Sequence, residues 1–261
     1  RKRAARIILK TGVRAVLITG GHLKENPDDL LLDEKGFQIF SSGRLSKLDV
    51  HGTGCVFSSA IAAKLALGES LRPAVQKTKE YIGESILGSV SSGNGIPCVE
   101  PFAVMYRENE KLKSLCDLEN AIEIFKKERI GNLIPEVQTN IGLGLSNAKR
   151  HEDVIAIPGR LIKNGEDIFT GVRPRFGGSR HVANIVLTMM QHDPEKRAVM
   201  NIKYTDSLLQ ICKKLKFQIA SFDRSKEPKK VRVREGSSLE WGTEKAITTY
   251  GSVPDIVYDL G

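Results

Sequence analysis

The sequence predicts a mixed α/β fold arranged in two units. Residues 13–19 (VRAVLIT) form a near-continuous apolar run, which is typical of a buried parallel strand. Residues 179–191 instead repeat apolar side chains at helical spacing. Between these segments the composition changes to small polar residues at 89–95 (SVSSGNG), a pattern typical of a linker. We therefore expect a first domain over residues 1–93, a linker over 94–110 and a second domain over 111–261.

The first unit is predicted to alternate helices with short strands. Gly12 and Gly68 each follow a helical stretch and are stop signals for it. Pro73 lies in the first turn of a further helix, where proline is tolerated. The expected elements are helices at 4–10, 53–67 and 71–87, the strand at 13–19 and, after the turn 33–36 (DEKG), a strand at 37–40.

The second unit shows the same alternation. Pro158 and Gly159 end one predicted strand, and Thr205 is a suitable N-cap for a helix with an apolar face. Helices are expected at 117–127, at 179–191 and after Thr205, and strands at 154–157, 198–204, 217–222 and 255–258.

The formal net charge of +9 leaves nucleic acid and small anions as competing partners. Lys and Arg are scattered among acidic residues, and neither a recognition helix nor an aromatic stacking platform is evident. We therefore expect phosphorylated small molecules rather than nucleic acid. No apolar run approaches the roughly 18 residues of a membrane span, so no membrane partner is expected. The small basic clusters are Arg1-Lys2-Arg3, Lys229-Lys230 and Arg232/Arg234.

The four cysteines have no CxxC spacing, so neither a disulfide framework nor a zinc site is expected, and a reducing cytoplasm is predicted. The chain does not begin with Met and opens on a basic helical stretch. We therefore expect a fragment of a longer protein. Its oligomeric state is not readable from the sequence.

The first candidate site is the turn His51-Gly52-Thr53-Gly54-Cys55 at the start of a predicted helix. Glycines around a hydroxyl residue can aim several backbone N–H groups at one point, beside the positive end of the helix dipole, and such a turn binds phosphate. The alternative is an ordinary glycine-rich helix entry with a buried cysteine. The residues alone leave both open, because short glycine motifs are unspecific.

This turn, together with Gly20-Gly21-His22-Leu23, resembles the hydroxymethylpyrimidine (phosphate) kinases of the ribokinase-like superfamily. The resemblance covers roughly residues 1–90. It implies that Gly52, Thr53 and Gly54 bind the transferring phosphoryl group of ATP and that Cys55 is catalytic. Thr19 departs from the lysine that many members have at this position. The pocket-bearing first half of the kinase is not in this chain, so we expect no kinase activity from it.

The second candidate site is a cluster of cationic and glycine residues after a predicted strand end. Arg160 follows the Pro-Gly turn, where α/β folds place ligand contacts. A glycine-rich turn then leads into a helix, and its free N–H groups beside guanidinium groups favour a polyanion. The alternatives are solvated arginines and a histidine that only starts a helix. The candidate residues are Arg160, Arg173, Arg175, Gly177, Gly178, Ser179, Arg180 and His181.

The chain from about residue 111 onward resembles the thiamine-phosphate synthase domain called ThiN. The matching stretches are PEVQTNIG (135–142), IPGR (157–160), RPRFGGSRHVA (173–183), NIKY (201–204), EWG (240–242) and PDIVYD (254–259). The resemblance implies a three-layer α/β/α domain with a mixed, AraD-like sheet, and functional roles for Arg160 and His181. Asn184 stands where the family often has a basic residue.

The implied reaction joins hydroxymethylpyrimidine diphosphate to hydroxyethylthiazole phosphate and yields thiamine phosphate and pyrophosphate. Arg160 and the N–H groups of the Gly177–His181 turn suit the departing negative charge, with Mg²⁺ bridging the phosphates. The metal ligands are unknown from the sequence. His181 is expected to protonate the leaving group or to orient a phosphate, and the sequence leaves both roles open.

Two alternative functions remain. The same domain fused to a DNA-binding module senses thiamine phosphate without catalysis, but no helix-turn-helix is evident here. The other alternative is hydroxymethylpyrimidine (phosphate) kinase activity of the full-length parent.

Overall fold

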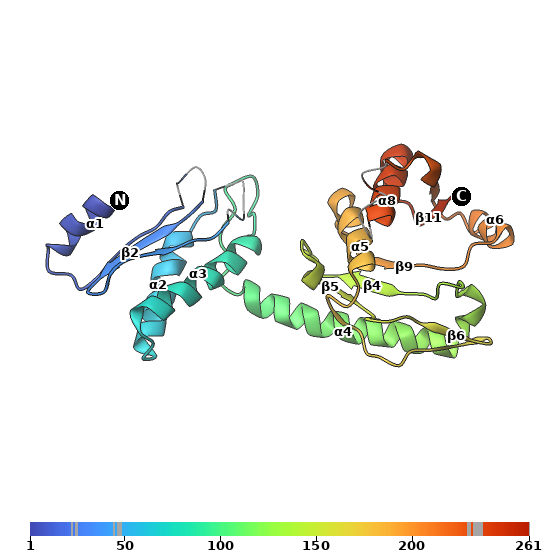
Figure 1. Ribbon diagram of the computed structural model, residues 1–261, viewed down its shortest axis with the longest axis horizontal. Helices are drawn as coiled ribbons and strands as arrows, with labels where there is room; N and C mark the ends of the chain where they lie inside the picture. Colours follow the sequence, from blue (N-terminus) through green and yellow to red (C-terminus); the bar gives the residue numbers. More distant parts are fainter. Residues whose placement is uncertain are drawn as a thin grey trace. The chain divides into compact units, whose positions relative to one another are not determined.

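The computed structural model describes residues 1–260 except 22, 24–25, 44, 46–48, 229–230 and 232–236. The chain divides into two compact units, Arg1–Tyr106 and Arg107–Gly261, whose elements are labelled in Figure 1. Some residues named from the sequence lie outside the described residues: His22 and the basic residues at 229–230, 232 and 234. Among the described residues, none of the helices is long and apolar enough to cross a membrane.

The first unit contains a three-stranded sheet in the order β1-β2-β3. Its strands are β1 (Val16–Ile18), β2 (Asp29–Asp33) and β3 (Gly36–Phe40). Both strand pairs are antiparallel, so the expectation of a parallel strand at 13–19 is wrong for the pairing found here. The physical reason is the connection: residues 19–28 are fewer than the dozen or more that a parallel crossover needs.

Helices cover both faces of this sheet. They are α1 (Lys2–Leu9), α2 (Thr53–Ala66) and α3 (Leu71–Leu87). Leu31 packs in one core with Phe57 of α2 and Val75 of α3, whereas Leu32 packs with Ala5 of α1. Successive residues of a strand point to opposite faces, so β2 is the buried centre of the unit. The predicted bounds of all three helices are confirmed to within a few residues.

A buried ion pair fixes the connection between β1 and β2. Lys79 Nζ lies 2.7 Å from Asp29 Oδ2 and 2.7 Å from the Pro27 carbonyl oxygen. The N–H group of Gly20 donates to Asp29 Oδ1 at 2.8 Å. Breaking such a pair by removing one partner is strongly destabilising, because it leaves an uncompensated buried charge. The pair therefore anchors both ends of the segment that carries Gly20-Gly21.

Helix α4 (Ala103–Lys127) begins well before the expected helix at 117–127. The second half of the expected linker, residues 103–110, is therefore helical. Neither glycine nor proline occurs between Ala103 and Lys127, so nothing in the sequence interrupts the helix. The domain boundaries drawn from the sequence remain a prediction.

The second unit is a helix–sheet–helix sandwich. Its antiparallel sheet has the order β8-β5-β4-β9, with α4 on one face and α5 (Arg180–His192) on the other (Figure 1). Ile155 of β5 packs with Leu118 and Ile122 of α4, whereas Val154 and Ala156 pack against α5. The expected three-layer arrangement is confirmed. The strands are β4 (Ile141–Gly144), β5 (Val154–Ala156), β8 (Arg175–Phe176) and β9 (Ala198–Met200).

Parallel and antiparallel pairing occur in separate sheets. The strands β10 (Ile219–Phe222) and β11 (Ile256–Asp259) form a parallel pair of their own, and β6 (Ile162–Asn164) pairs with β7 (Asp167–Phe169) as a hairpin. Two further α-helices of the described residues are α6 (Asp206–Lys214) and α8 (Ser237–Tyr250). Short 3-10 helices lie at Ile130–Leu133, His151–Asp153 and Arg224–Lys226. The hydroxyl of Thr205 caps α6 by accepting from the Leu208 N–H group at 3.1 Å, as predicted.

Two glycines of β4 let α5 approach the sheet closely. A Cβ atom on Gly142 would lie 2.2 Å from Val182 Cγ1, and one on Gly144 would lie 2.8 Å from Met190 Sδ. Any side chain at these positions would push the helix away. Because Val182 is near the start of α5 and Met190 near its end, the helix runs along β4 with its N-terminus at the Gly142 end.

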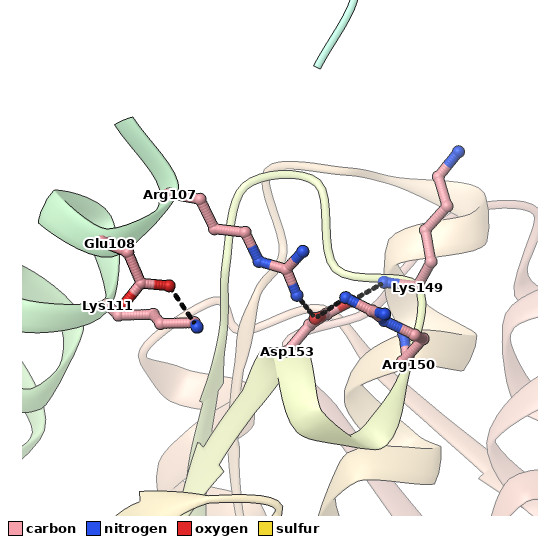
Figure 2. A network of polar contacts seen from close by, with 6 residues as sticks. All are labelled: Arg107, Glu108, Lys111, Lys149, Arg150 and Asp153. Atoms are coloured by element: carbon pink, nitrogen blue, oxygen red, sulfur yellow. Dashed lines mark hydrogen bonds and ion pairs between the residues drawn. The ribbon is translucent and has the colours of Figure 1, made fainter. Parts of the chain in front are cut away.

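Asp153 joins α4 to the turn that precedes β5 (Figure 2). Its carboxylate is paired with Arg107 of α4 and accepts the N–H groups of Lys149 at 2.9 Å and Arg150 at 3.0 Å. Asp153 is only 4% exposed. This buried charge is satisfied by several donors at once, which fixes where β5 begins.

Candidate functional site

Arg160 lies in a loop whose backbone is held on both sides. The N–H group and carbonyl oxygen of Leu161 bond to Thr139 at 2.7 and 3.2 Å. The side-chain amide of Asn140 donates to the carbonyl oxygens of Ile157 at 2.9 Å and Gly159 at 3.1 Å. The Arg160 side chain is exposed and makes no hydrogen bond or ion pair within the described part of the chain. A fixed backbone therefore presents a guanidinium group to solvent.

Asn201 ties a third stretch of sequence to this loop. Its Oδ1 accepts from the Asn140 N–H group at 2.8 Å, and its Nδ2 donates to the Gln138 carbonyl oxygen at 2.9 Å. The Thr139 hydroxyl donates to the Asn201 carbonyl oxygen at 2.9 Å. The sequence reasoning did not single out either asparagine. Their only signal was their place in the stretches 135–142 and 201–204 that carry the family resemblance.

The glycine-rich turn before α5 is confirmed as a tight turn, but two of its backbone N–H groups already donate hydrogen bonds within the unit. Gly177 has a φ of 67°, in the left-handed region that favours glycine. Its N–H group donates to the Val154 carbonyl oxygen at 2.9 Å, and that of Gly178 to the Arg175 carbonyl oxygen at 3.1 Å. Of the N–H groups in the Gly177–His181 turn that were expected to face the departing charge, these two are thus already donated within the unit.

The first turn of α5 supplies the remaining amides. The N–H groups of Arg180, His181 and Val182 donate to no acceptor among the residues that the structure describes, and the Ser179 hydroxyl caps none of them. This turn contains no acidic residue. Three free donors at the positive end of a helix dipole are suited to bind a phosphate group.

The Arg160 loop and the start of α5 meet the same edge of the sheet. Asn140 immediately precedes β4, and Ile157 immediately follows its antiparallel partner β5. The start of α5 lies at this edge because Val182 packs over Gly142. The structure thus brings Arg160, the Gly177–Ser179 turn and the first turn of α5 to one end of the two central strands.

Arg175 and Arg180 add positive charge on the α5 side of this edge. Arg175 is paired across the strands with Ala156, which faces α5, and cross-strand partners share a face. Both arginines are exposed, and His181 is half-buried beside Arg180. The combination of guanidinium groups, free amides and one imidazole is suited to a polyanion.

Arg173 is placed differently from the other candidates. Its side chain is 93% exposed, and its nearest acidic partner is Glu119 of α4, 4.0 Å away. Helix α4 covers the opposite face of the sheet from α5. The structure therefore does not bring Arg173 to the free amides of α5.

Asn184 stands where the family often has a basic residue. Its side chain makes hydrogen bonds within the second unit. Its Oδ1 lies 2.6 Å from His151 Nε2, and its Nδ2 lies 3.3 Å from Glu240 Oε2. These contacts link α5 to the turn before β5 and to α8. Asn184 thus holds three elements together in this chain.

The kinase-like turn of the first unit is a second, separate candidate. Gly52 has a φ of 85°, and α2 begins at Thr53 directly after it. Gly54 has open space around the position of a Cβ atom. Cys55 is exposed in the first turn of the helix. This exposure removes the alternative in which Cys55 is a buried core residue, whereas phosphate binding by the turn remains a prediction.

The described residues contain no group of three or more His, Cys, Asp or Glu side chains placed to hold a metal ion. The side chains named at the Arg160 edge include no carboxylate, which is the protein ligand that Mg²⁺ usually takes. We therefore assign no protein ligands to this metal.

Comparison with known proteins gives two family matches along the chain. The model for thiamine-phosphate synthase ThiN matches residues 117–261, and that for phosphomethylpyrimidine kinase matches residues 1–100. The thiamine-phosphate synthase ThiN of Methanothermobacter thermautotrophicus is 36% identical over 158 residues, which cover 60% of this chain and 80% of that protein.

A relative with both parts is also found. The bifunctional thiamine biosynthesis protein ThiDN of Methanocaldococcus jannaschii is 40% identical over 240 residues, which cover 90% of this chain and 53% of that protein. A crystal structure of the C-terminal domain of phosphomethylpyrimidine kinase matches with a TM-score of 0.54 and 35% identity, covering 58% of this chain and 86% of the other. The chain thus spans about half the length of its bifunctional relative.

Proposed function

Because the chain belongs to the thiamine-phosphate synthase ThiN family, we propose that its second unit makes thiamine phosphate. The substrates are hydroxymethylpyrimidine diphosphate and hydroxyethylthiazole phosphate, and the second product is pyrophosphate. The observation that carries this proposal is the convergence of Arg160 with the free amides of α5 at one edge of the sheet. Such a site fits a substrate whose charge lies on its phosphates.

The chemistry consists of one bond broken and one bond formed. The C–O bond between the pyrimidine methylene carbon and the diphosphate breaks, and the diphosphate leaves with the electron pair. The lone pair of the thiazole nitrogen then forms a C–N bond to the same carbon. Catalysis requires the developing negative charge on the leaving group to be stabilised while water is excluded.

Arg160 and the amides of α5 are suited to that leaving group. A guanidinium group can grip two phosphate oxygens at once, and backbone N–H groups that are already oriented need no reorganisation. We assign Arg175 and Arg180 to the outer phosphate oxygens because both are exposed on the α5 side. His181 in the same turn donates to a phosphate oxygen or protonates the leaving group.

Mg²⁺ would accompany the diphosphate of the substrate, since it is usually bound through substrate phosphates with few protein ligands. For the first unit we propose that Gly52, Thr53, Gly54 and Cys55 surround the phosphoryl group transferred from ATP in a longer protein. The match of residues 1–100 to phosphomethylpyrimidine kinase supports this assignment.

One incubation tests the proposed reaction. The chain is mixed with both phosphorylated precursors and Mg²⁺, and thiamine phosphate and pyrophosphate are measured by chromatography. We expect both products in equal amounts. Binding of thiamine phosphate without any turnover would instead favour the sensing alternative.

A further inference from the structure

The buried side chain of Asn140 donates its hydrogen bonds to the loop that carries Arg160. It is only 2% exposed, and both hydrogens of its amide are donated to that loop, at 2.9 Å to the Ile157 carbonyl oxygen and 3.1 Å to the Gly159 carbonyl oxygen. Its Oδ1 accepts from the Ile141 N–H group at 2.8 Å, which fixes the orientation of the amide.

The chemistry of this contact requires an amide. Two carbonyl oxygens, at Ile157 and Gly159, converge on one nitrogen, and Pro158 between them has no N–H group to offer. A hydroxyl side chain would supply one hydrogen, and a carboxylate would supply none. An unpaired carbonyl oxygen in a buried setting is costly, so replacing the amide should displace the loop.

The rest of the loop holds the backbone on both sides of Arg160. Leu161, directly after it, is fully buried and bonded to Thr139 in both directions. Asn201 in turn holds the backbone of Asn140. The Arg160 side chain has no bond within the described residues, so the contacts of the backbone determine from where its guanidinium can reach a ligand.

We propose that Asn140 is a positioning residue that acts through Arg160: its amide holds the Ile157–Gly159 turn so that the guanidinium reaches the diphosphate. This inference rests on the proposed synthase function. Asn140 itself does not need to touch the substrate.

A double-mutant cycle on the full chain tests the inference. Asn140→Asp keeps the shape and the acceptor but replaces the two donated hydrogens by an oxygen facing two carbonyl oxygens. We expect kcat to fall at least about tenfold, whereas KM for the thiazole phosphate stays within about twofold. In the Arg160→Ala background the same change should cost less than about twofold. Residues that act through one another are coupled in this way.

Further variants separate positioning from simple loss of structure. Asn140→Ser keeps one donor and should give an intermediate loss of kcat. Thr188→Ala is the matched control, because Thr188 is also buried in this unit. Among the described residues, its hydroxyl bonds only within α5, to the Asn184 carbonyl oxygen. Hydrogen exchange should rise at the Leu161 amide, which donates to the Thr139 carbonyl oxygen, in the Asn140 variants and not in the control.

The outcomes distinguish this inference from the proposed function. If the unaltered chain makes no thiamine phosphate, the function fails, and the same cycle is then measured as affinity for inorganic pyrophosphate by calorimetry. A loss from Asn140→Asp that is equal in both backgrounds would overturn the positioning role, in turnover or in affinity. Unchanged exchange at the Leu161 amide would overturn it as well. So would pyrophosphate affinity that is the same with and without the Arg160 side chain.

Discussion

Gly178 lies directly against the carbonyl oxygen of Ala156, so that a Cβ atom on this glycine would be only 2.3 Å from it. Ala156 is the last residue of β5, and Gly178 is two residues before α5 begins. The start of the helix is therefore seated on the end of the strand. The free amides of α5 and the loop of Arg160 share this support.

Gly178→Ala is expected to lower synthase activity at least tenfold, because the turn has to move away from Ala156 and takes the first turn of α5 with it. The change in barrier corresponds to about 1.4 kcal/mol. Steady-state kinetics measures the loss. Gly171→Ala is the control, since its Cβ would meet only Phe169 at an ordinary 3.6 Å. An active Gly178→Ala variant would show that the anion is not held by this turn.

Arg160→Ala is expected to reduce the rate of thiamine phosphate formation at least roughly tenfold, because one oriented charged donor is lost from the leaving group. Arg160→Lys should recover only part of the loss, since a lysine cannot grip two oxygens in a plane. Arg173→Ala is the contrasting variant, because its side chain is directed toward Glu119. Equal rates for the Arg160 variant and the unaltered chain would exclude this arginine from the site.

Local signals were sufficient to predict most helices. Residues 71–87 were predicted as a helix and are helical over that range, and Thr205 caps α6 as expected. Strands were harder because their partners are distant in sequence. Strand β4 was missed since Gly142 and Gly144 interrupt its apolar pattern, and the approach of α5 that requires them is a tertiary contact.

The candidate site was predictable where a residue follows a strand end or begins a helix. Arg160 and His181 were found in this way, and the structure brings both segments to one edge of the sheet. Arg173 was grouped with them by sequence distance alone, yet a short strand and a turn direct it elsewhere. Asn140 was not found, because a neutral amide gives no charge signal and its partners are 17 and 19 residues away.

Asp153→Ala is expected to destabilise the second unit by about 3 kcal/mol, because it leaves Arg107 without its buried carboxylate and frees two backbone N–H groups. Chemical denaturation gives the free energy of unfolding. Glu108→Ala is a matched control, because Glu108 directly follows Arg107 in α4 and also forms an ion pair, with Lys111 (Figure 2). That pair is exposed, so its loss should lower the free energy of unfolding by less than about 0.5 kcal/mol. Similar losses in both variants would contradict this account.

The first unit is expected to lose stability at low pH, because protonation of Asp33 weakens its ion pair with Arg72. Arg72 donates to both carboxylate oxygens at 2.8 and 2.6 Å, and this hydrogen bonding holds the pKa of Asp33 below its ordinary value. A lowered folded-state pKa means that the contribution is present above the unfolded value of about 3.9 and is lost as pH falls through the folded value.

Thermal unfolding of the unaltered chain and of Asp33→Asn at several pH values measures this contribution. The difference in Tm should be largest near neutral pH and should shrink below about pH 4, where the unaltered side chain also loses its charge. A difference that stays constant down to the lowest pH would assign the effect to packing instead of charge.

His181 is expected to act on a phosphate, and His181→Asn should keep the fold but lose most synthase activity. The residue lies in the first turn of α5, beside Arg180 and behind two glycines, where the helix dipole favours anions. Residues at helical spacing from it include Gly177, Gly178 and Asn184, none of which is a usual metal ligand. Asparagine preserves a hydrogen-bond donor but cannot carry a positive charge or transfer a proton.

Two measurements on this variant separate the roles left open for His181. Circular dichroism and the Tm should match those of the unaltered chain, which establishes that the fold is kept. If His181 orients a phosphate, affinity for inorganic pyrophosphate falls together with kcat. If it protonates the leaving group, kcat falls while that affinity stays. Full activity and unchanged affinity would make His181 only a helix-start residue, and a structure with zinc on its ring would refute the assignment to phosphate.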